Sequence, residues 1–153
     1  MPYTESHFEE AVLELLCEHL GYNYLYGPDI ARDYRDPLYE DVLKDSLSAV
    51  NSSLPIEAIN DAIYKLKNFE TGSIVQKNTT FMDYLQNGVP VKYFVKDEEN
   101  PRGGERSGLV YLIDYENIEN NTFYAINQWT IMENSEKRPD ILIFVNGFPL
   151  VII

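Results

Sequence analysis

Asp140 is the residue whose surroundings most clearly suggest chemistry. It follows Arg138-Pro139 and directly precedes the apolar run Ile141–Val145, which is typical of a β-strand. A carboxylate at a strand start suits Mg²⁺, a hard cation that takes carboxylate and water oxygens as ligands. Such a cation neutralises developing charge and activates water in phosphodiester hydrolysis. One aspartate seldom holds Mg²⁺ well, so the alternative is a surface aspartate that caps the strand.

A tight turn after Asp140 would bring another segment beside it. Asn146-Gly147 separates two apolar runs, and Asn-Gly is the strongest short signal for a two-residue hairpin turn. With this turn, Val145 pairs with Phe148 and Asp140 lies opposite Ile153. Pro139 then lies opposite the next position along the chain. A second carboxylate across this hairpin would complete a clamp for the cation.

Other polar residues in the second half favour structural roles. Arg102 and Arg106 flank two glycines and could contact phosphate, but neighbouring acidic residues favour a solvated, self-compensated loop. Gln128 could approach DNA, although an amide that satisfies a strand is the simpler interpretation. Trp129 is expected in the core.

The sequence shows no other recognisable catalytic or cofactor motif. Cys17 and His19 are two residues apart on a predicted helix and do not face each other, and Cys17 is expected to be a small core residue. One cysteine and two histidines make a zinc cage improbable. The pair Gly103-Gly104 lacks the following Lys-Ser/Thr of a phosphate-binding loop, so ATP binding is not expected in these residues.

The first half of the chain predicts helices. Apolar residues at helical spacing mark a first helix that begins near Ser6, whose Ser6-His7-Phe8-Glu9 matches a capping box, and ends at Gly21. Three further helices are predicted from Pro37 to Val50, after Pro55 to Leu66, and over Thr79–Asn87. The short aromatic segment Tyr22–Tyr26 is predicted as a strand at a sheet edge.

The second half predicts neighbouring antiparallel strands. A loop over residues 97–108 and a turn over residues 116–121 separate them. The expected fold class is α/β, a mixed, largely antiparallel sheet flanked by helices. The strands are predicted over Val89–Lys96, Leu109–Tyr115, Thr122–Met132, Asp140–Val145 and Pro149–Ile153.

Composition describes an ordinary globular domain with an acidic surface. The 153 residues carry a net charge of −13, and 44% are hydrophobic, which predicts one domain with a sizeable core. The apolar runs are far shorter than the ~18 residues of a membrane-spanning helix, so no membrane partner is expected. The acidic N-terminus and the single cysteine favour a reducing, cytoplasmic location. The charge disfavours non-specific nucleic-acid binding by this chain alone.

The segment Arg138–Val151 resembles the nuclease domain of type I restriction enzyme R (HsdR) subunits. Other similar elements are Gly21-Tyr22 through Asp29, Ile113-Asp114-Tyr115 and Ile126-Asn127-Gln128-Trp129. The resemblance implies a restriction-endonuclease-like core with a Pro-Asp…Glu-x-Lys motif, in which Asp140 is a catalytic, metal-binding residue. It also implies that Glu-x-Lys follows Ile153, so that residues 1–153 are an N-terminal endonuclease domain fragment truncated within its C-terminal hairpin strand.

The same resemblance implies the partners and the activity. The implied activity is Mg²⁺-dependent cleavage of double-stranded DNA, and the implied partners are the modification and specificity subunits. The resemblance also implies an ATP-driven motor further along the polypeptide. The 153 residues alone are expected to be inactive, with weak or absent Mg²⁺ binding. A glutamate of the first helix is implied as a second catalytic metal ligand. Glu9 shares a helical stripe with Leu13, Leu16 and Leu20, although Glu5 could replace it, or Glu9 could serve the capping box.

A function of another class stays open at this point. A charge of −13 also suits a non-catalytic acidic module that mimics DNA or docks on a basic protein. The acids are scattered along predicted amphipathic helices, however, and form no duplex-like row.

Overall fold

The computed structural model describes residues 4–153, which fold into two compact units. The first unit consists of the chain up to Leu43 together with Thr122–Ile153, and the second unit consists of Lys44–Asn121. Helices and strands are both present, and the largest sheet contains parallel and antiparallel pairs, so the predicted mixed α/β class is confirmed.

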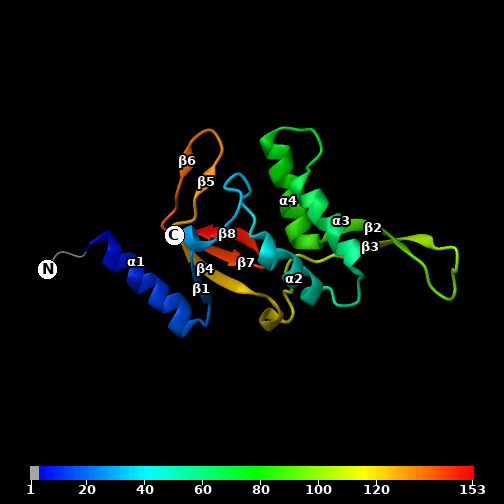
Figure 1. Ribbon diagram of the computed structural model, residues 1–153, viewed down its shortest axis with the longest axis horizontal. Coiled ribbons are helices and arrows are strands. Elements are labelled where there is room, and N and C mark those ends of the chain that lie inside the picture. Colours follow the sequence, from blue (N-terminus) through cyan, green and yellow to red (C-terminus); the bar gives the residue numbers. More distant parts are fainter. Residues whose placement is uncertain (1–3) are drawn as a thin grey trace. The chain divides into compact units, whose positions relative to one another are not determined.

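A four-stranded sheet in the order β1-β4-β7-β8 forms the centre of the first unit. β1 runs parallel to β4, whereas β4–β7 and β7–β8 are antiparallel. Figure 1 shows β4 (yellow) between β1 (blue) and the β7–β8 hairpin (orange to red). The predicted edge position of the aromatic strand is therefore confirmed. The bounds are Asn23–Tyr26 for β1, Phe123–Asn127 for β4, Ile141–Val145 for β7 and Phe148–Ile152 for β8.

Both faces of this sheet bury apolar side chains, because β4 and β7 are nearly continuous apolar runs and consecutive side chains point to opposite faces. Ile126, Leu142 and Phe144 pack with Trp129 on one side. The other side carries the first helix. Its cluster contains Leu16, Ala125 and Ile141, with Val12, Leu13, Cys17, Tyr22 and Ile143 partly buried around it.

The first helix begins earlier than its capping-box pattern predicts. α1 spans Glu5–Glu14 and is continued by a π-helical turn, Leu15–His19. Thr4 is the N-cap, and its hydroxyl lies 2.6 Å from His7 Nδ1. The predicted cap at Ser6 is therefore wrong, because Thr4 and His7 form the reciprocal pair. This shift leaves the carboxylate of Glu9 available for another partner.

The predicted hairpin forms, but its register shifts by one residue. Asn146 and Gly147 both adopt positive φ, and Val145 pairs with Phe148 as expected. A bulge between Ile143 and Phe144 then moves the pairing, so that Ile141 and Ile153 exchange backbone hydrogen bonds of 3.3 and 2.9 Å. The expectation that Asp140 lies opposite Ile153 is therefore wrong. A bulge adds one residue to one strand, which sequence alternation does not show.

Gly147 should be the least replaceable glycine of this hairpin. It has φ +89°, and an added Cβ would lie 2.8 Å from Tyr39 O and 2.9 Å from Leu43 Cα. Gly147→Ala should lower the free energy of unfolding by about 2–4 kcal/mol through backbone strain and overpacking. Gly21→Ala is the matched control, because Gly21 has φ +73° with nothing within 4 Å of the added Cβ. Urea unfolding measured by circular dichroism should show the larger loss for Gly147→Ala, and equal losses would contradict the crowding argument.

The long strand predicted over Thr122–Met132 is interrupted. β4 ends at Asn127 because Gln128 turns the chain with φ +55°. The chain then forms a small separate hairpin of β5 (Ile131–Met132) and β6 (Glu136–Lys137), which the sequence does not predict. This break takes the residues that follow Asn127 out of the four-stranded sheet.

The second unit pairs helices with its own hairpin instead of extending the larger sheet. α3 packs against β2, and β2 pairs with β3 in a two-stranded sheet. The predicted single sheet is therefore wrong. β3 begins five residues before the strand predicted over Leu109–Tyr115, inside the predicted loop, and residues 111–115 form no strand, so that prediction is wrong in both bounds. α4 begins five residues early because Ser73 caps it. The bounds are Glu40–Val50 for α2, which crosses the unit boundary, Ile56–Lys67 for α3, Ile74–Asn87 for α4, Val89–Val95 for β2 and Gly104–Val110 for β3.

The predicted start of α2 at Pro37 is also wrong. Asp36 Oδ1 accepts a hydrogen bond of 2.9 Å from the backbone N–H of Leu38, which forms a side-chain turn before the helix. Throughout residues 4–153, no helix is both long and apolar enough to cross a membrane.

Candidate active site

Glu9 of α1 faces the end of β4 in the first unit. Asn127 Nδ2 donates a hydrogen bond of 2.8 Å to Glu9 Oε1, and Gln128 Nε2 lies 3.5 Å from Oε2. Glu9 is half-buried, whereas Glu5, one helical turn earlier, is exposed. The helix reaches this position because Leu13 and Leu16, on the same stripe, pack against the sheet. Of the two candidate glutamates, the structure brings Glu9 into contact with the strand residues.

Asn127 is held on its other side by β1. Its side-chain oxygen accepts a hydrogen bond of 3.0 Å from the Tyr24 hydroxyl, and Asn127 is 8% exposed. The pKa of Tyr24 is raised, chiefly by burial and further by the nearby Glu9 carboxylate, while the hydrogen bond with Asn127 acts in the opposite direction. Tyr24, Asn127 and Glu9 therefore form one connected chain of side chains, contributed by β1, β4 and α1.

Gln128 joins this chain to the segment that carries Asp140. The backbone N–H of Gln128 donates to Asp140 O at 3.0 Å, while its side-chain amide lies beside Glu9. Asp140 itself is exposed and immediately precedes β7. The left-handed φ of Gln128 is uncommon for a residue with a side chain, and such outliers concentrate at functional sites. Gln128, at the end of β4, therefore contacts both the Glu9 carboxylate and the backbone of Asp140.

The chemistry of this site suits a hard cation but needs further ligands. Glu9 and Asp140 offer carboxylate oxygens, which Mg²⁺ prefers, and water can fill several of its positions. Within residues 4–153, no three side chains of His, Cys, Asp or Glu lie together as a metal-binding group. The two carboxylates fit Mg²⁺ in donor type, and a complete site requires at least one more protein ligand or bound waters.

The arginine-containing loop of the second unit does not show the properties of a phosphate site. Arg106 pairs with Asp97 at 2.5 Å, and Lys92 pairs with Glu105 at 3.3 Å. These ion pairs support the self-compensated interpretation of the loop.

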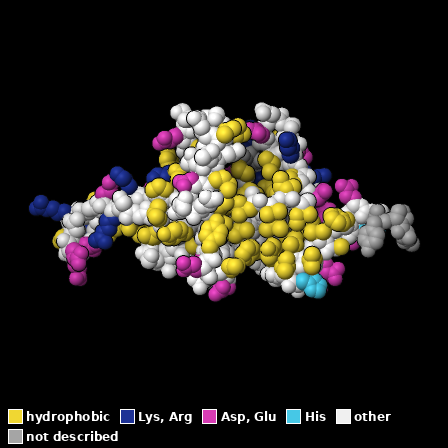
Figure 2. Space-filling model, turned by 180° about the vertical axis from the view of Figure 1, so that it is seen from behind, with side chains coloured by type: hydrophobic (Ala, Val, Ile, Leu, Met, Phe, Trp, Pro, Cys, Tyr) yellow, Lys and Arg dark blue, Asp and Glu magenta, His cyan; other side chains and the backbone are white. Residues whose placement is uncertain are grey.

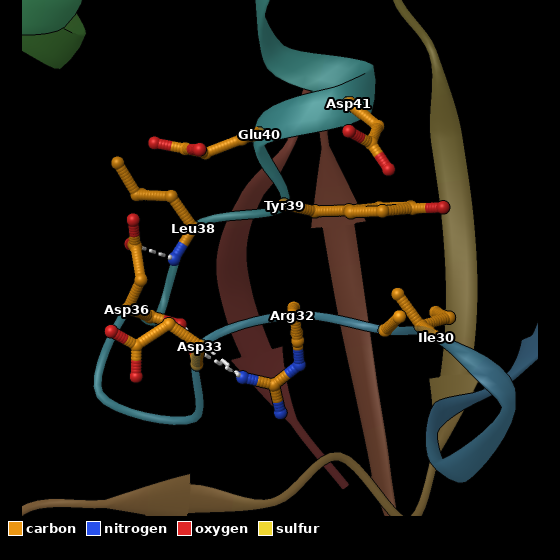
Figure 3. Close-up of a pocket in the computed structure, with 9 residues that line it drawn as sticks. Ile30, Arg32, Asp33, Asp36, Leu38, Tyr39, Glu40 and Asp41 are labelled. Atoms are coloured by element: carbon orange, nitrogen blue, oxygen red, sulfur yellow. Dashed lines mark hydrogen bonds between the residues drawn. The ribbon is translucent and has the colours of Figure 1, made fainter.

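A second feature of the first unit is structural, and the sequence did not indicate it. The guanidinium of Arg32 lies 3.5 Å from the centroid of the Trp129 ring and donates to backbone carbonyls of Asp33, Asp36 and Thr130. Burial lowers the pKa of Arg32. Figure 3 shows Arg32 and Tyr39 in the adjoining pocket of about 110 Å³. Because Asp33 and Asp36 accept from nearby backbone N–H groups, this pocket is part of a tightly bonded loop.

Cys17 has the structural role that was expected for it. It packs at the edge of the cluster around Leu16, and burial and the charge of Glu18 raise the pKa of its thiol. A raised pKa disfavours the reactive thiolate. His7 belongs to the cap of α1, as described above.

Comparison with known proteins identifies the family. The model of the type I restriction enzyme R protein N terminus matches residues 2–153. The type I restriction enzyme HindI endonuclease subunit of Haemophilus influenzae is 32% identical over 97% of this chain, and the chain covers 14% of that protein. Two putative type I restriction enzyme endonuclease subunits of Methanocaldococcus jannaschii are each 30% identical to this chain. The match covers 94% of this chain for MjaIXP and 100% for MjaVIIIP.

These relatives are much longer than this chain. It spans about 14% of each of the three proteins and corresponds to the N-terminal part of the R subunit. The matched region contains all the residues of the candidate site. The chain therefore belongs to the family of type I restriction enzyme R protein N-terminal domains.

Proposed function

We propose that this domain cleaves double-stranded DNA with Mg²⁺, as part of the R subunit of a type I restriction enzyme. The observation that carries the proposal is the inward orientation of Glu9, bonded to Asn127 and connected through Gln128 to the Asp140 segment. These contacts and its partial burial distinguish Glu9 from Glu5, which is exposed. The endonuclease names of the relatives support the same reaction class.

The proposed roles follow from what phosphodiester hydrolysis requires. Glu9 and Asp140 would hold Mg²⁺ by their carboxylates, and the bound ion would neutralise charge on the phosphate and activate water. Asn127 and Gln128 place neutral amide groups beside the Glu9 carboxylate, so its negative charge stays available for a cation. The apolar clusters on both faces of the sheet fix the strands that carry these groups.

The proposal includes a Glu-x-Lys motif that directly follows Ile153 in the parent polypeptide. The observed register pairs Ile141 with Ile153, so the following position would lie opposite Asp140. A glutamate there would be a third carboxylate of the site. The lysine two residues later would point to the same side of its strand and could orient water. Reading the parent gene past codon 153 tests this part of the proposal.

The rest of the complex is proposed on the family relationship. We place sequence recognition in specificity and modification subunits, an ATP-driven motor in a later part of the R polypeptide, and the assembled enzyme in the cytoplasm. The net charge of −13 agrees with most DNA-binding contacts being made by other parts of the complex. On the face shown in Figure 2, acidic side chains lie apart from one another among hydrophobic and other side chains. This pattern does not favour the DNA-mimic alternative.

The proposal is tested on the full-length R subunit assembled with its modification and specificity subunits. With ATP present throughout, plasmid DNA carrying the recognition sequence should be cleaved when Mg²⁺ is supplied. Excess EDTA should abolish cleavage, and added Mg²⁺ should restore it. The 153 residues alone should not cleave DNA at the same Mg²⁺ concentration. Robust cleavage by these residues, or cleavage by the complex that persists in EDTA, would contradict the proposal.

A further inference from the structure

We infer that Asn127 and Tyr24 are positioning residues that hold the Glu9 carboxylate ready for a divalent cation. This inference rests on the proposed function and adds two residues to it. Its basis is the chain of hydrogen bonds from the Tyr24 hydroxyl to Asn127 Oδ1, 3.0 Å, and from Asn127 Nδ2 to Glu9 Oε1, 2.8 Å.

The Tyr24 hydroxyl determines which end of the Asn127 amide faces Glu9. An asparagine side chain offers an acceptor oxygen and a donor nitrogen that can exchange places by a simple flip. The Tyr24 hydroxyl donates to the oxygen, so the nitrogen points to the carboxylate. The flipped amide would place its oxygen against a carboxylate oxygen, and the two acceptors would repel. A phenylalanine at position 24 would remove this bias while it preserved the ring.

The location of Asn127 makes it a firm support. It is the last residue of β4, pairs with Tyr26 on one side and Ile141 on the other, and is 8% exposed. Glu9, by contrast, extends from a helix and needs a fixed partner to select one rotamer. Supporting residues that orient a metal ligand commonly contribute about 10–100-fold to metal affinity or activity. Asn127 and Tyr24 have the position and the bonds for that task.

The test measures cation binding apart from cleavage. Mn²⁺ is titrated into the full-length R subunit without DNA or nucleotide, and free Mn²⁺ is counted by electron paramagnetic resonance. Asn127→Leu, which is nearly equal in size and cannot donate, should weaken Mn²⁺ binding by about 10–100-fold. Tyr24→Phe should weaken it measurably but by less than Asn127→Leu does, because the amide is kept and only its orientation is freed. Tyr26→Phe removes a hydroxyl from the same side of β1, two residues away, and should bind Mn²⁺ as the unaltered subunit does.

A second measurement distinguishes positioning from a general loss of structure. In the assembled enzyme, Tyr24→Phe should raise the Mg²⁺ concentration for half-maximal cleavage and leave the rate at saturating Mg²⁺ within about twofold. Thermal melting of each variant shows whether it folds. If Asn127→Leu does not fold, the inference is judged on Tyr24→Phe alone. Unchanged Mn²⁺ binding and unchanged Mg²⁺ dependence in folded Tyr24→Phe and Asn127→Leu would overturn the inference. If Glu9→Gln and Asp140→Asn also leave both measurements unchanged, the proposed function fails as well.

Discussion

Replacement of Asp140 by asparagine should reduce Mg²⁺-dependent DNA cleavage by the assembled enzyme more than about 100-fold. Loss of a residue that only supports a metal ligand commonly costs about 10–100-fold, so loss of a ligand carboxylate should cost more. Asparagine keeps the size of the side chain, and Asp140 is exposed, so the variant should fold normally. The backbone bond from Gln128 N to Asp140 O does not depend on the side chain. Cleavage of plasmid DNA over time measures the loss.

Glu9→Gln should reduce cleavage to a similar extent, and Glu5→Gln should not. Both glutamates lie on α1, but Glu9 contacts the end of β4 and Glu5 is exposed. The pair thus separates a role in the site from a role of acidic charge on the helix. A loss in Glu5→Gln that equals the loss in Glu9→Gln would assign the effect to helix charge. Normal cleavage by Asp140→Asn would remove Asp140 from the proposed site.

Trp129→Ala should lower the free energy of unfolding by about 3–5 kcal/mol, the usual cost of removing a large buried aromatic side chain. Trp129 is fully buried, and the centroid of its ring lies 4.7 Å from the centroid of the Phe144 ring in an edge-to-face arrangement. The variant would leave a large cavity. It would also remove the ring beneath the Arg32 guanidinium, whose charge is partly desolvated. The cavity and the loss of the contact with Arg32 both lower the free energy of unfolding.

Urea unfolding followed by far-ultraviolet circular dichroism measures this loss. Phe8→Ala is the control within the same unit, because Phe8 is 62% exposed and its removal should change stability by less than about 0.5 kcal/mol. A loss below about 1 kcal/mol for Trp129→Ala would mean that the cluster around Ile126, Leu142 and Phe144 closes over the cavity.

Several elements were predictable because their signals are local. The Asn146-Gly147 turn needs two positive φ angles, and these residue types provide them. An unbroken apolar run predicted β7, and helical spacing of apolar residues predicted α3. Asp140 and Glu9 are proposed as site residues on the basis of a family resemblance and not of their spacing.

Other elements were predicted incorrectly because local signals compete. Two capping boxes overlap at the start of α1, and Thr4 with His7 prevails over Ser6 with Glu9. The charged, glycine-containing segment before Leu109 resembles a loop, yet it forms β3 because β2 supplies a pairing partner. Propensity is a weak guide where a neighbouring strand satisfies the backbone.

By itself, the sequence determined the mixed α/β class, the edge strand β1, the final hairpin and the family, since each depends on short patterns of residue type. Tertiary structure alone decided the bulge that shifts Ile141 to pair with Ile153, and the choice of Glu9 over Glu5. It also decided the contact between Tyr24 and Asn127, which are 103 residues apart. These features depend on how β1, β4 and α1 meet in space. Hydrogen bonds between such distant residues leave no periodic signal in the chain, because each partner is fixed by the packing of its own element.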